Sequence, residues 1–289
     1  MKKIVIFLIL ILATFASNAN EVLDNVSGKI SEFAAGLIPG EGLTEVDVEF
    51  KGASEPTFTV LGVRDIQKNE TSNYFTQFSL VNNDVGGDDR YTGNIGFGYR
   101  TLTVDESLML GFNAFYDRDL TKKKHSRASF GVEAKASVLD FNVNRYMALT
   151  KRQAVNGTQE QSLGGIDYSL ISQIPHMPWA TFGYTGYKHY ADKAVIDTDG
   201  EIYTLGMALS PTLQLDISSD QSNHEDGDVE AVNLSFIYPP EDNKPTLADG
   251  FISDEIWHKE SMKNKLSEKV KRNNNLTVEI QGAVIFTKK

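Results

Sequence analysis

The side chains that could perform catalysis are few and scattered. The 289 residues include five histidines and no cysteine, which excludes thiol catalysis, disulfides and zinc–cysteine sites. Two combinations, Asp119 with His125 and Asp192 with His189, contain the groups of an acid–base pair. No HExxH, GxSxG, GxGxxG or P-loop motif accompanies them. We therefore expect neither an enzyme nor a bound cofactor.

Metal and nucleic-acid chemistry are also disfavoured. Residues 197–200 (DTDG) resemble the start of a calcium-binding loop, but the glutamate that completes such a loop is missing. An ordinary acidic loop is the better interpretation, and we expect no metal site. The formal net charge is −11, whereas binding to nucleic-acid phosphates requires a positive surface.

A second set of polar side chains repeats at alternate positions and suits an enclosed, wet interior. Charges buried in a narrow lumen need hydrogen bonds or ion pairs. We expect these side chains to face the lumen. The set comprises Arg100, Arg127, Glu133, Lys135, Asp140, Asn142, Asn144, Asp167 and Asp216.

These residues belong to segments in which apolar and polar side chains alternate. The segments cover 44–51, 57–63, 74–81, 90–100, 107–116, 127–136, 139–149, 165–171, 179–190, 201–209, 212–219 and 229–238. Twelve such segments predict an all-β fold, a transmembrane antiparallel 12-stranded outer-membrane β-barrel over residues 44–238. A soluble β-sandwich also alternates, but the ions on the polar face and the even strand number favour the barrel. The last segment ends on Phe236 and Tyr238, which we interpret as a barrel-assembly signal.

The lengths of the connections predict how the barrel is oriented. Short connections are expected at 101–106, 137–138, 172–178 and 210–211, and longer polar ones at 82–89, 117–126, 151–161, 191–200 and 220–228. Short turns face the periplasm and long loops face outward. Arg145 is an exception, because it falls on the lipid face if the alternation of 139–143 continues. A bulge or a position near the headgroups would accommodate it, and the sequence leaves both open.

The two ends of the chain differ from the barrel. Residues 1–19 carry two lysines, a short apolar stretch and small residues before Asn20, which indicates a signal peptide. Residues 20–43 are expected to form a short periplasmic segment, with an amphipathic helix over 21–38. Residues 239–245 break the sheet, 247–270 predict a polar helix, and 276–286 are again extended. From the residues alone, this last part could lie in the lumen or in the periplasm.

Seven short motifs, in order and spacing, resemble the translocator domain of the intimin/invasin family, the inverse autotransporters of type V secretion. They are FTQFSL (75–80), DRYTGNIGFGYR (89–100), GFNAFYDRDL (111–120), RASFGVEA (127–134), IDYSL (166–170), KHYAD (188–192) and KRNNNLTVEI (271–280). The resemblance implies a twelve-stranded barrel, a pore helix, and an extended linker that carries a passenger to the cell surface. It implies that 247–270 is the pore helix inside the lumen. Asn273, Asn274 and Asn275 would then open the linker, and the predicted lumen side chains would form hydrogen bonds and ion pairs with the helix and linker.

The expected function is that of an outer-membrane translocator or anchor, here without an attached passenger. The alternatives are a passenger-less pore or structural envelope protein, and an adhesin that acts through loops 151–161 and 191–200. We expect a monomer in the bacterial outer membrane that meets outer-membrane lipid, the barrel-assembly machinery and periplasmic chaperones. A passenger on a separate chain is a further expected partner, and nucleic acid is not.

Overall fold

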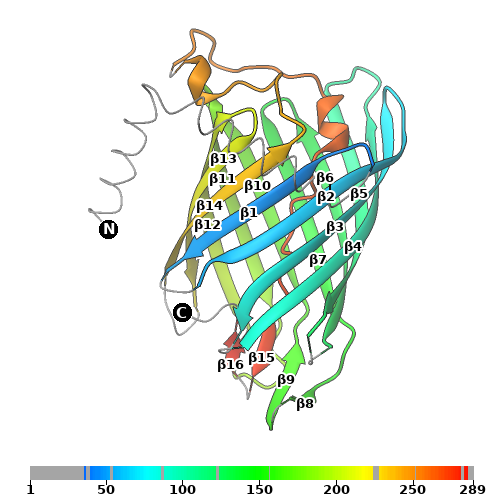
Figure 1. Ribbon diagram of the computed structural model, residues 1–289, viewed down its shortest axis with the longest axis vertical. Coiled ribbons are helices and arrows are strands. Elements are labelled where there is room, and N and C mark those ends of the chain that lie inside the picture. Colours follow the sequence, from blue (N-terminus) through cyan, green and yellow to red (C-terminus); the bar gives the residue numbers. More distant parts are fainter. Residues whose placement is uncertain are drawn as a thin grey trace.

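Twelve strands close into an antiparallel barrel (Figure 1). The computed structural model describes Gly36 and residues 40–52, 55–85, 88–121, 124–155, 157–223, 228–250, 252–280 and 283–285. The strands are β1 (Thr44–Lys51), β2 (Thr57–Lys68), β3 (Ser72–Val85), β4 (Asp88–Leu102), β5 (Leu108–Asp119), β6 (Ser126–Ala136), β7 (Leu139–Ala148), β10 (Gly165–Ile174), β11 (Met177–His189), β12 (Thr198–Ser210), β13 (Leu213–Ser222) and β14 (Val229–Tyr238). Each predicted segment corresponds to one of them, so the predicted barrel is confirmed.

Side-chain alternation gives the barrel an apolar outer face and a polar inner face. Successive side chains of a strand point to opposite faces, and large apolar side chains such as Phe97, Phe130 and Leu170 are 59%, 58% and 44% exposed. Their neighbours in the same strands, such as Arg100 and Arg127, are fully buried. Burying polar side chains while exposing apolar ones suits a wall with lipid outside and protein inside.

The first and last strands close the barrel along one seam. β1 pairs with β14 over its whole length, from Thr44 opposite Tyr238 to Lys51 opposite Ala231. Phe236 lies opposite Val46 in this seam. The chain therefore enters and leaves the barrel at the same end. The role of Phe236 and Tyr238 as an assembly signal stays a prediction.

The two ends of the barrel differ in their connections. At the end where β1 begins, two-residue turns at 137–138, 175–176 and 211–212 join the strands. We call this the turn end, and the opposite end, with connection 149–164, the loop end. By the rule for bacterial barrels the turn end faces the periplasm. The expected loop 82–89 is mostly strand, because β3 and β4 extend to Val85 and from Asp88.

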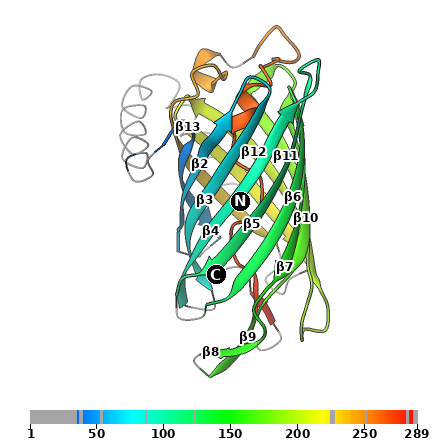
Figure 2. The ribbon, with the colours of Figure 1, turned by 90° about the vertical axis from the view of Figure 1, so that its right-hand side faces the viewer.

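A second, four-stranded sheet stands at the loop end (Figure 2). The expected loop 151–161 contains a hairpin, β8 (Gln153–Val155) and β9 (Thr158–Ser162). β9 pairs with β15 (Val278–Ile280), which in turn pairs with β16 (Ala283–Ile285). The far end of the sequence therefore meets a connection between two barrel strands.

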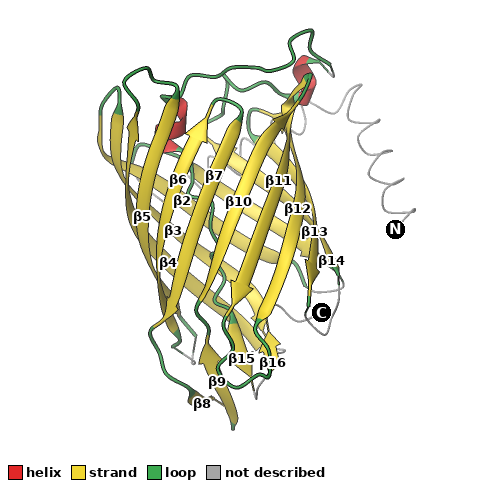
Figure 3. Ribbon diagram, turned by 180° about the vertical axis from the view of Figure 1, so that it is seen from behind, coloured by secondary structure: helices red, strands yellow, loops and turns green. Residues whose placement is uncertain are grey.

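The helix predicted over 247–270 is wrong. Apart from residue 251, which is not described, this part contains only two 3₁₀ turns, η1 (Leu247–Asp249) and η2 (Asn264–Ser267) (Figure 3). Its backbone instead bonds to the barrel: the N–H groups of His258 and Glu260 donate to the Gln173 and Ser137 side chains at 2.9 Å. Because the wall accepts these donors, the backbone of this segment does not need a helix to satisfy its hydrogen bonds.

The segment after η2 lies in the lumen, where it contacts inward residues of β3 to β7. The choice left open by the residues is therefore settled for the lumen. Among the described residues, no helix has the length and apolar character needed to cross a membrane. The expected signal peptide lies outside the described residues, and so does the helix over 21–38 except for Gly36.

Arg145 is accommodated near the loop end without a bulge. β7 pairs in unbroken register with β6 and β10 through this position. The Arg145 guanidinium lies 4.6 Å from the centre of the Tyr190 ring, just beyond the end of β11. Near the membrane surface, a lipid-facing arginine costs about 0–1 kcal/mol.

A charge at the middle of the lipid face should be far less tolerated. Leu170 lies mid-strand in β10 and points outward. We expect Leu170→Arg to lower the free energy of unfolding in lipid vesicles by about 2–4 kcal/mol. The control Leu170→Met should cost less than about 1.5 kcal/mol. Equal losses for the two variants in denaturant titrations would contradict the assignment of this face to lipid.

Candidate functional site: a lumen filled by the chain's own linker

Residues 264–280, the 3₁₀ turn η2 followed by extended chain, run through the barrel from the turn end to the loop end, and from here on we call this range the linker. Figure 1 shows it passing from η2 to β15 between the walls. It leaves the lumen at Leu276 and Thr277, both buried, where the Thr277 carbonyl accepts the Leu163 N–H at 3.0 Å. The site is therefore the inner face of the barrel together with the linker.

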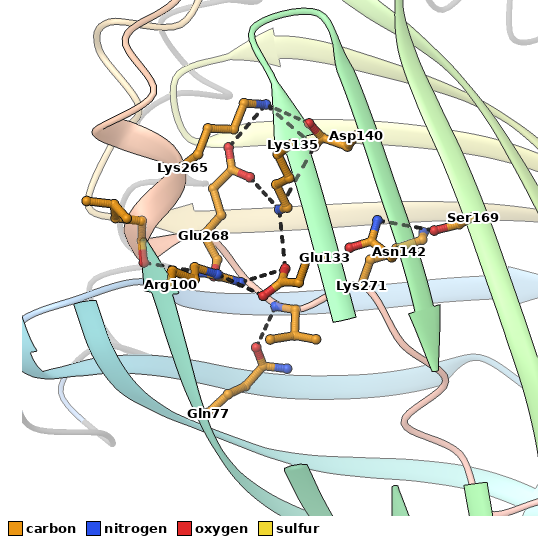
Figure 4. Close-up of polar contacts among 12 residues, drawn as sticks. Gln77, Arg100, Glu133, Lys135, Asp140, Asn142, Ser169, Lys265, Glu268 and Lys271 are labelled. Atoms are coloured by element: carbon orange, nitrogen blue, oxygen red, sulfur yellow. Dashed lines mark hydrogen bonds and ion pairs between the residues drawn. The ribbon is translucent and has the colours of Figure 1, made fainter. Parts of the chain in front are cut away.

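Arg100 of β4 and Glu133 of β6 form a fully buried ion pair, and Arg100 also binds the linker (Figure 4). Two guanidinium nitrogens donate to the two carboxylate oxygens at 2.9 and 3.0 Å. Gly111 of the intervening strand leaves room, since a Cβ there would lie 2.9 Å from Glu133 Oε1. The remaining Arg100 nitrogen, Nη1, donates to the carbonyls of Leu266 and Glu268 at 3.3 and 2.5 Å.

Charges alternate between wall and linker near the turn end. Lys135 donates to Glu268 at 2.8 Å, and Lys265 lies 3.3 Å from Asp140 (Figure 4). Lys269 pairs with Glu45 of β1. Each of these three linker ions thus has an opposite charge on the wall, as ions removed from water require.

A carboxylate on the wall, Asp117 of β5, joins two arginines at the middle of the linker. It accepts Arg127 Nε at 2.8 Å and Arg272 Nη2 at 2.7 and 2.9 Å, and all three side chains are at 0% exposure. Arg127 also donates to the Asn273 carbonyl at 2.8 Å. The two guanidinium groups lie 4.2 and 4.3 Å from the ring centres of Tyr146 and Phe115, within cation–π range.

β7 supplies a third set of contacts. The Asn144 side-chain amide donates to Asp167 at 2.7 Å and to the Lys271 carbonyl at 2.9 Å. The Tyr146 hydroxyl donates to Asp167 at 2.6 Å and accepts the Asn273 N–H at 2.8 Å. Asp167 therefore positions the Asn144 and Tyr146 side chains, which bind the linker, and these two hydrogen bonds do not join Asp167 to the linker itself.

Not every predicted lumen residue reaches the linker. Asn142 donates to Ser169 at 3.3 Å, and Asp216 accepts from Gln214 at 2.7 Å, so these bonds join wall to wall. In the predicted asparagine run, Asn274 accepts Arg272 Nη1 at 2.7 Å, and the Asn275 N–H donates to the Asn273 side chain. The run thus binds mainly within the linker, whereas the Asn273 backbone binds the wall.

The sequence reasoning missed several linker contacts. Asp117 falls in the expected loop 117–126, although continuing the alternation of 107–116 by one residue places it on the inner face. Tyr146 follows the same inward parity as Asn142 and Asn144. Gln77, whose Oε1 accepts the Val270 N–H at 2.7 Å, gives no signal beyond its place in a strand. The linker charges Lys265, Glu268 and Lys269 lie within the range of the expected polar helix, 247–270, and Arg272 lies just after it.

A cavity of about 230 Å³ lies beside the linker at the turn end. Its wall includes small inward residues of β11 and β12, among them Gly183, Thr185 and Gly206. Asp216 lines the same cavity. The linker thus binds the β3–β7 side of the lumen more closely. Within the described part of the chain, no group of three or more His, Asp or Glu side chains could hold a metal ion.

The Arg100–Glu133 pair allows a direct test of this arrangement. We expect Glu133→Ala to lower the free energy of unfolding by about 3–5 kcal/mol, because it leaves Arg100 buried without a counter-ion. Replacing both, Arg100→Met with Glu133→Leu, should cost clearly less, since no charge is left unpaired. Denaturant titration in detergent or lipid measures both. A double variant less stable than the single one would contradict the assigned burial.

Comparison with known proteins agrees with this geometry. The family model described as "Inverse autotransporter, beta-domain" matches residues 17–274. Invasin of Yersinia enterocolitica is 28% identical over 159 residues, which cover 51% of this chain and 18% of that protein. A putative attaching and effacing protein homolog of Escherichia coli K12 is 29% identical over 126 residues, 43% of this chain and 41% of that protein. The chain thus spans less than half of these two relatives.

A solved structure supports the fold. It was reported under the heading "Unveiling the Mechanism Behind the in-meso Crystallization of Membrane Proteins". It superimposes with a TM-score of 0.66 at 17% identity and covers 83% of this chain and all of that one. The closed twelve-stranded barrel and the matching family model place the protein in the bacterial outer membrane. The chain belongs to the inverse autotransporter β-domain family.

Proposed function

We propose that this barrel carries its own linker across the outer membrane and anchors whatever is joined to it at the cell surface. The observation that supports this most directly is the path of the linker. It enters at the turn end, binds the wall through Arg100 and Asp117, and reaches the sheet at the loop end. A chain held in this way crosses the whole bilayer without exposing its backbone to lipid, as membrane crossing requires.

The contacts also support a plugged barrel over an open pore. Two guanidinium groups, those of Arg127 and Arg272, pair with the buried carboxylate of Asp117 inside the lumen. Removing the linker would leave Asp117 with Arg127 alone and leave wall groups such as Lys135 without their linker partner. Unpaired buried ions are costly, so the linker is expected to remain in place at rest.

The adhesin alternative receives less support. Both loops that it would use are occupied by the chain itself, because the hairpin in 151–161 pairs with β15 and the N–H groups of 192–194 bind Glu279. We likewise propose that the barrel has no enzymatic activity. His125 is fully buried beside Glu160, at 3.3 Å, so a substrate has no access to it.

Outer-membrane lipid, the barrel-assembly machinery and periplasmic chaperones are the partners that this function would need. A passenger joined to the linker, or supplied by a separate chain, would be its cargo. The outward apolar face of the barrel supports the contact with lipid. The other partners follow from the proposed route to the membrane.

Conductance in planar bilayers tests the proposal. We expect the full chain to be almost closed, and deletion of residues 247–289 to open a steady pore, because the lumen then holds no linker. The same deletion should keep the heat-dependent gel mobility of a folded barrel. A full chain that conducts as well as the deletion variant would support the passenger-less pore instead.

A further inference from the structure

A single carboxylate of the linker, Glu279 in β15, occupies a fitted site at the loop end. Its side chain is at 0% exposure. Its oxygens accept the consecutive backbone N–H groups of Asp192, Lys193 and Ala194 at 2.8, 3.0 and 3.1 Å. Arg152 donates to the same carboxylate. Three aligned N–H groups with one guanidinium form a concave anion site.

The groups that form this site belong to different connections and are held in place independently of Glu279. The Ala191 N–H donates to Asp197 at 2.9 Å, which closes the loop over 191–197. Arg152, from the connection that carries β8 and β9, also donates to Asp192 at 2.7 Å. The two connections are thus tied together around the carboxylate.

The hairpin that pairs with the linker is itself fixed to the barrel. Glu160 of β9 is 1% exposed and accepts Arg90 of β4 through both oxygens at 3.0 Å. β15 then pairs with β9 in the register Val278 opposite Ser162 and Ile280 opposite Glu160. Backbone pairing alone does not specify register, because a slip by two residues preserves the alternation of faces.

The sequence leaves one candidate for the anion site. Between Glu268 and Lys289, Glu279 is the only acidic residue. Burial by itself would raise the pKa of Glu279, but the three backbone N–H groups and Arg152 hold it below its ordinary value. The side chain is therefore ionised at neutral pH, and a slipped linker would leave the site without a carboxylate.

We propose that the loop over 191–197 and Arg152 form a receptor for the Glu279 carboxylate that sets the register at which the linker stops in the barrel. The inference rests on the proposed function, since it concerns the same linker. With Glu279 in place, Arg272 lies at Asp117 and Asn273 at Arg127. A slip by two residues would break these contacts together.

The test uses the full chain in planar bilayers with the substitution Glu279→Gln, which keeps shape and removes charge. Loss of a charge-assisted contact of this kind should raise the open probability by about tenfold or more. Arg152→Ala, made on the receptor side, should act in the same direction. Glu255→Gln is the matched control, because Glu255 is exposed and lies before the linker. Heat-dependent gel mobility verifies that each variant forms the barrel.

A disulfide that fixes the register of β15 on β9 tests whether a change of register causes the opening, as opposed to a general weakening of the contacts between linker and wall. The chain has no cysteine, so Ser162→Cys with Val278→Cys introduces one pair at directly opposed positions. In the Glu279→Gln background, the oxidised pair should restore the closed state, and reduction should reopen it.

The outcomes distinguish the two proposals. A full chain that already conducts like the 247–289 deletion overturns the proposed function. A closed full chain whose Glu279→Gln and Arg152→Ala variants conduct no more than Glu255→Gln overturns the receptor and leaves the function standing. An oxidised pair that forms but does not restore closure also overturns the assignment of register to this carboxylate.

Discussion

The central constraint on this molecule is that charges inside a closed β-barrel need partners. Many ions on the inner face are buried, and buried ions without partners are strongly destabilising. Asp117 shows the consequence. It is fully buried and accepts one arginine from the wall, Arg127, and one from the linker, Arg272. Charged groups of the wall and of the linker therefore neutralise one another.

The same constraint explains why the lumen segment is extended and not helical. A helix satisfies its own backbone groups, whereas an extended chain offers N–H and C=O groups to its surroundings. Here the wall uses them: Arg100 and Arg127 bind linker carbonyls, and Gln77 and Tyr146 accept linker N–H groups. Binding through the backbone depends little on side-chain identity.

The linker is also held unevenly. Its bonds concentrate on β3 to β7, while the cavity beside it is lined by small residues of β11 and β12. The two loops at the far end then grip β15 through backbone pairing and through the Glu279 carboxylate. The chain is thus fixed at both mouths of the barrel and along one side between them.

Much of this architecture follows from the sequence, and the exceptions have physical reasons. Period-two alternation gave all twelve barrel strands, because lipid and lumen impose opposite demands on successive residues. The expected strand ends fall short where polar residues continue a strand, as at Asp117 in β5 and Asn82 in β3. The helix over 247–270 was wrong because helical spacing and polar composition do not reveal that a wall will accept the backbone donors. The pairing of β9 with β15 joins residues more than 100 positions apart, so local patterns carry no sign of it.

Occupancy of the lumen can be measured directly by cross-linking. Gln77 on β3 and Val270 on the linker are joined by a 2.7 Å hydrogen bond inside the barrel, and the chain has no native cysteine. With cysteines at these two positions, a short thiol cross-linker applied to intact outer membranes should join wall to linker in most molecules. Absence of the cross-link in a barrel that keeps its heat-dependent gel mobility would contradict a linker held in the lumen.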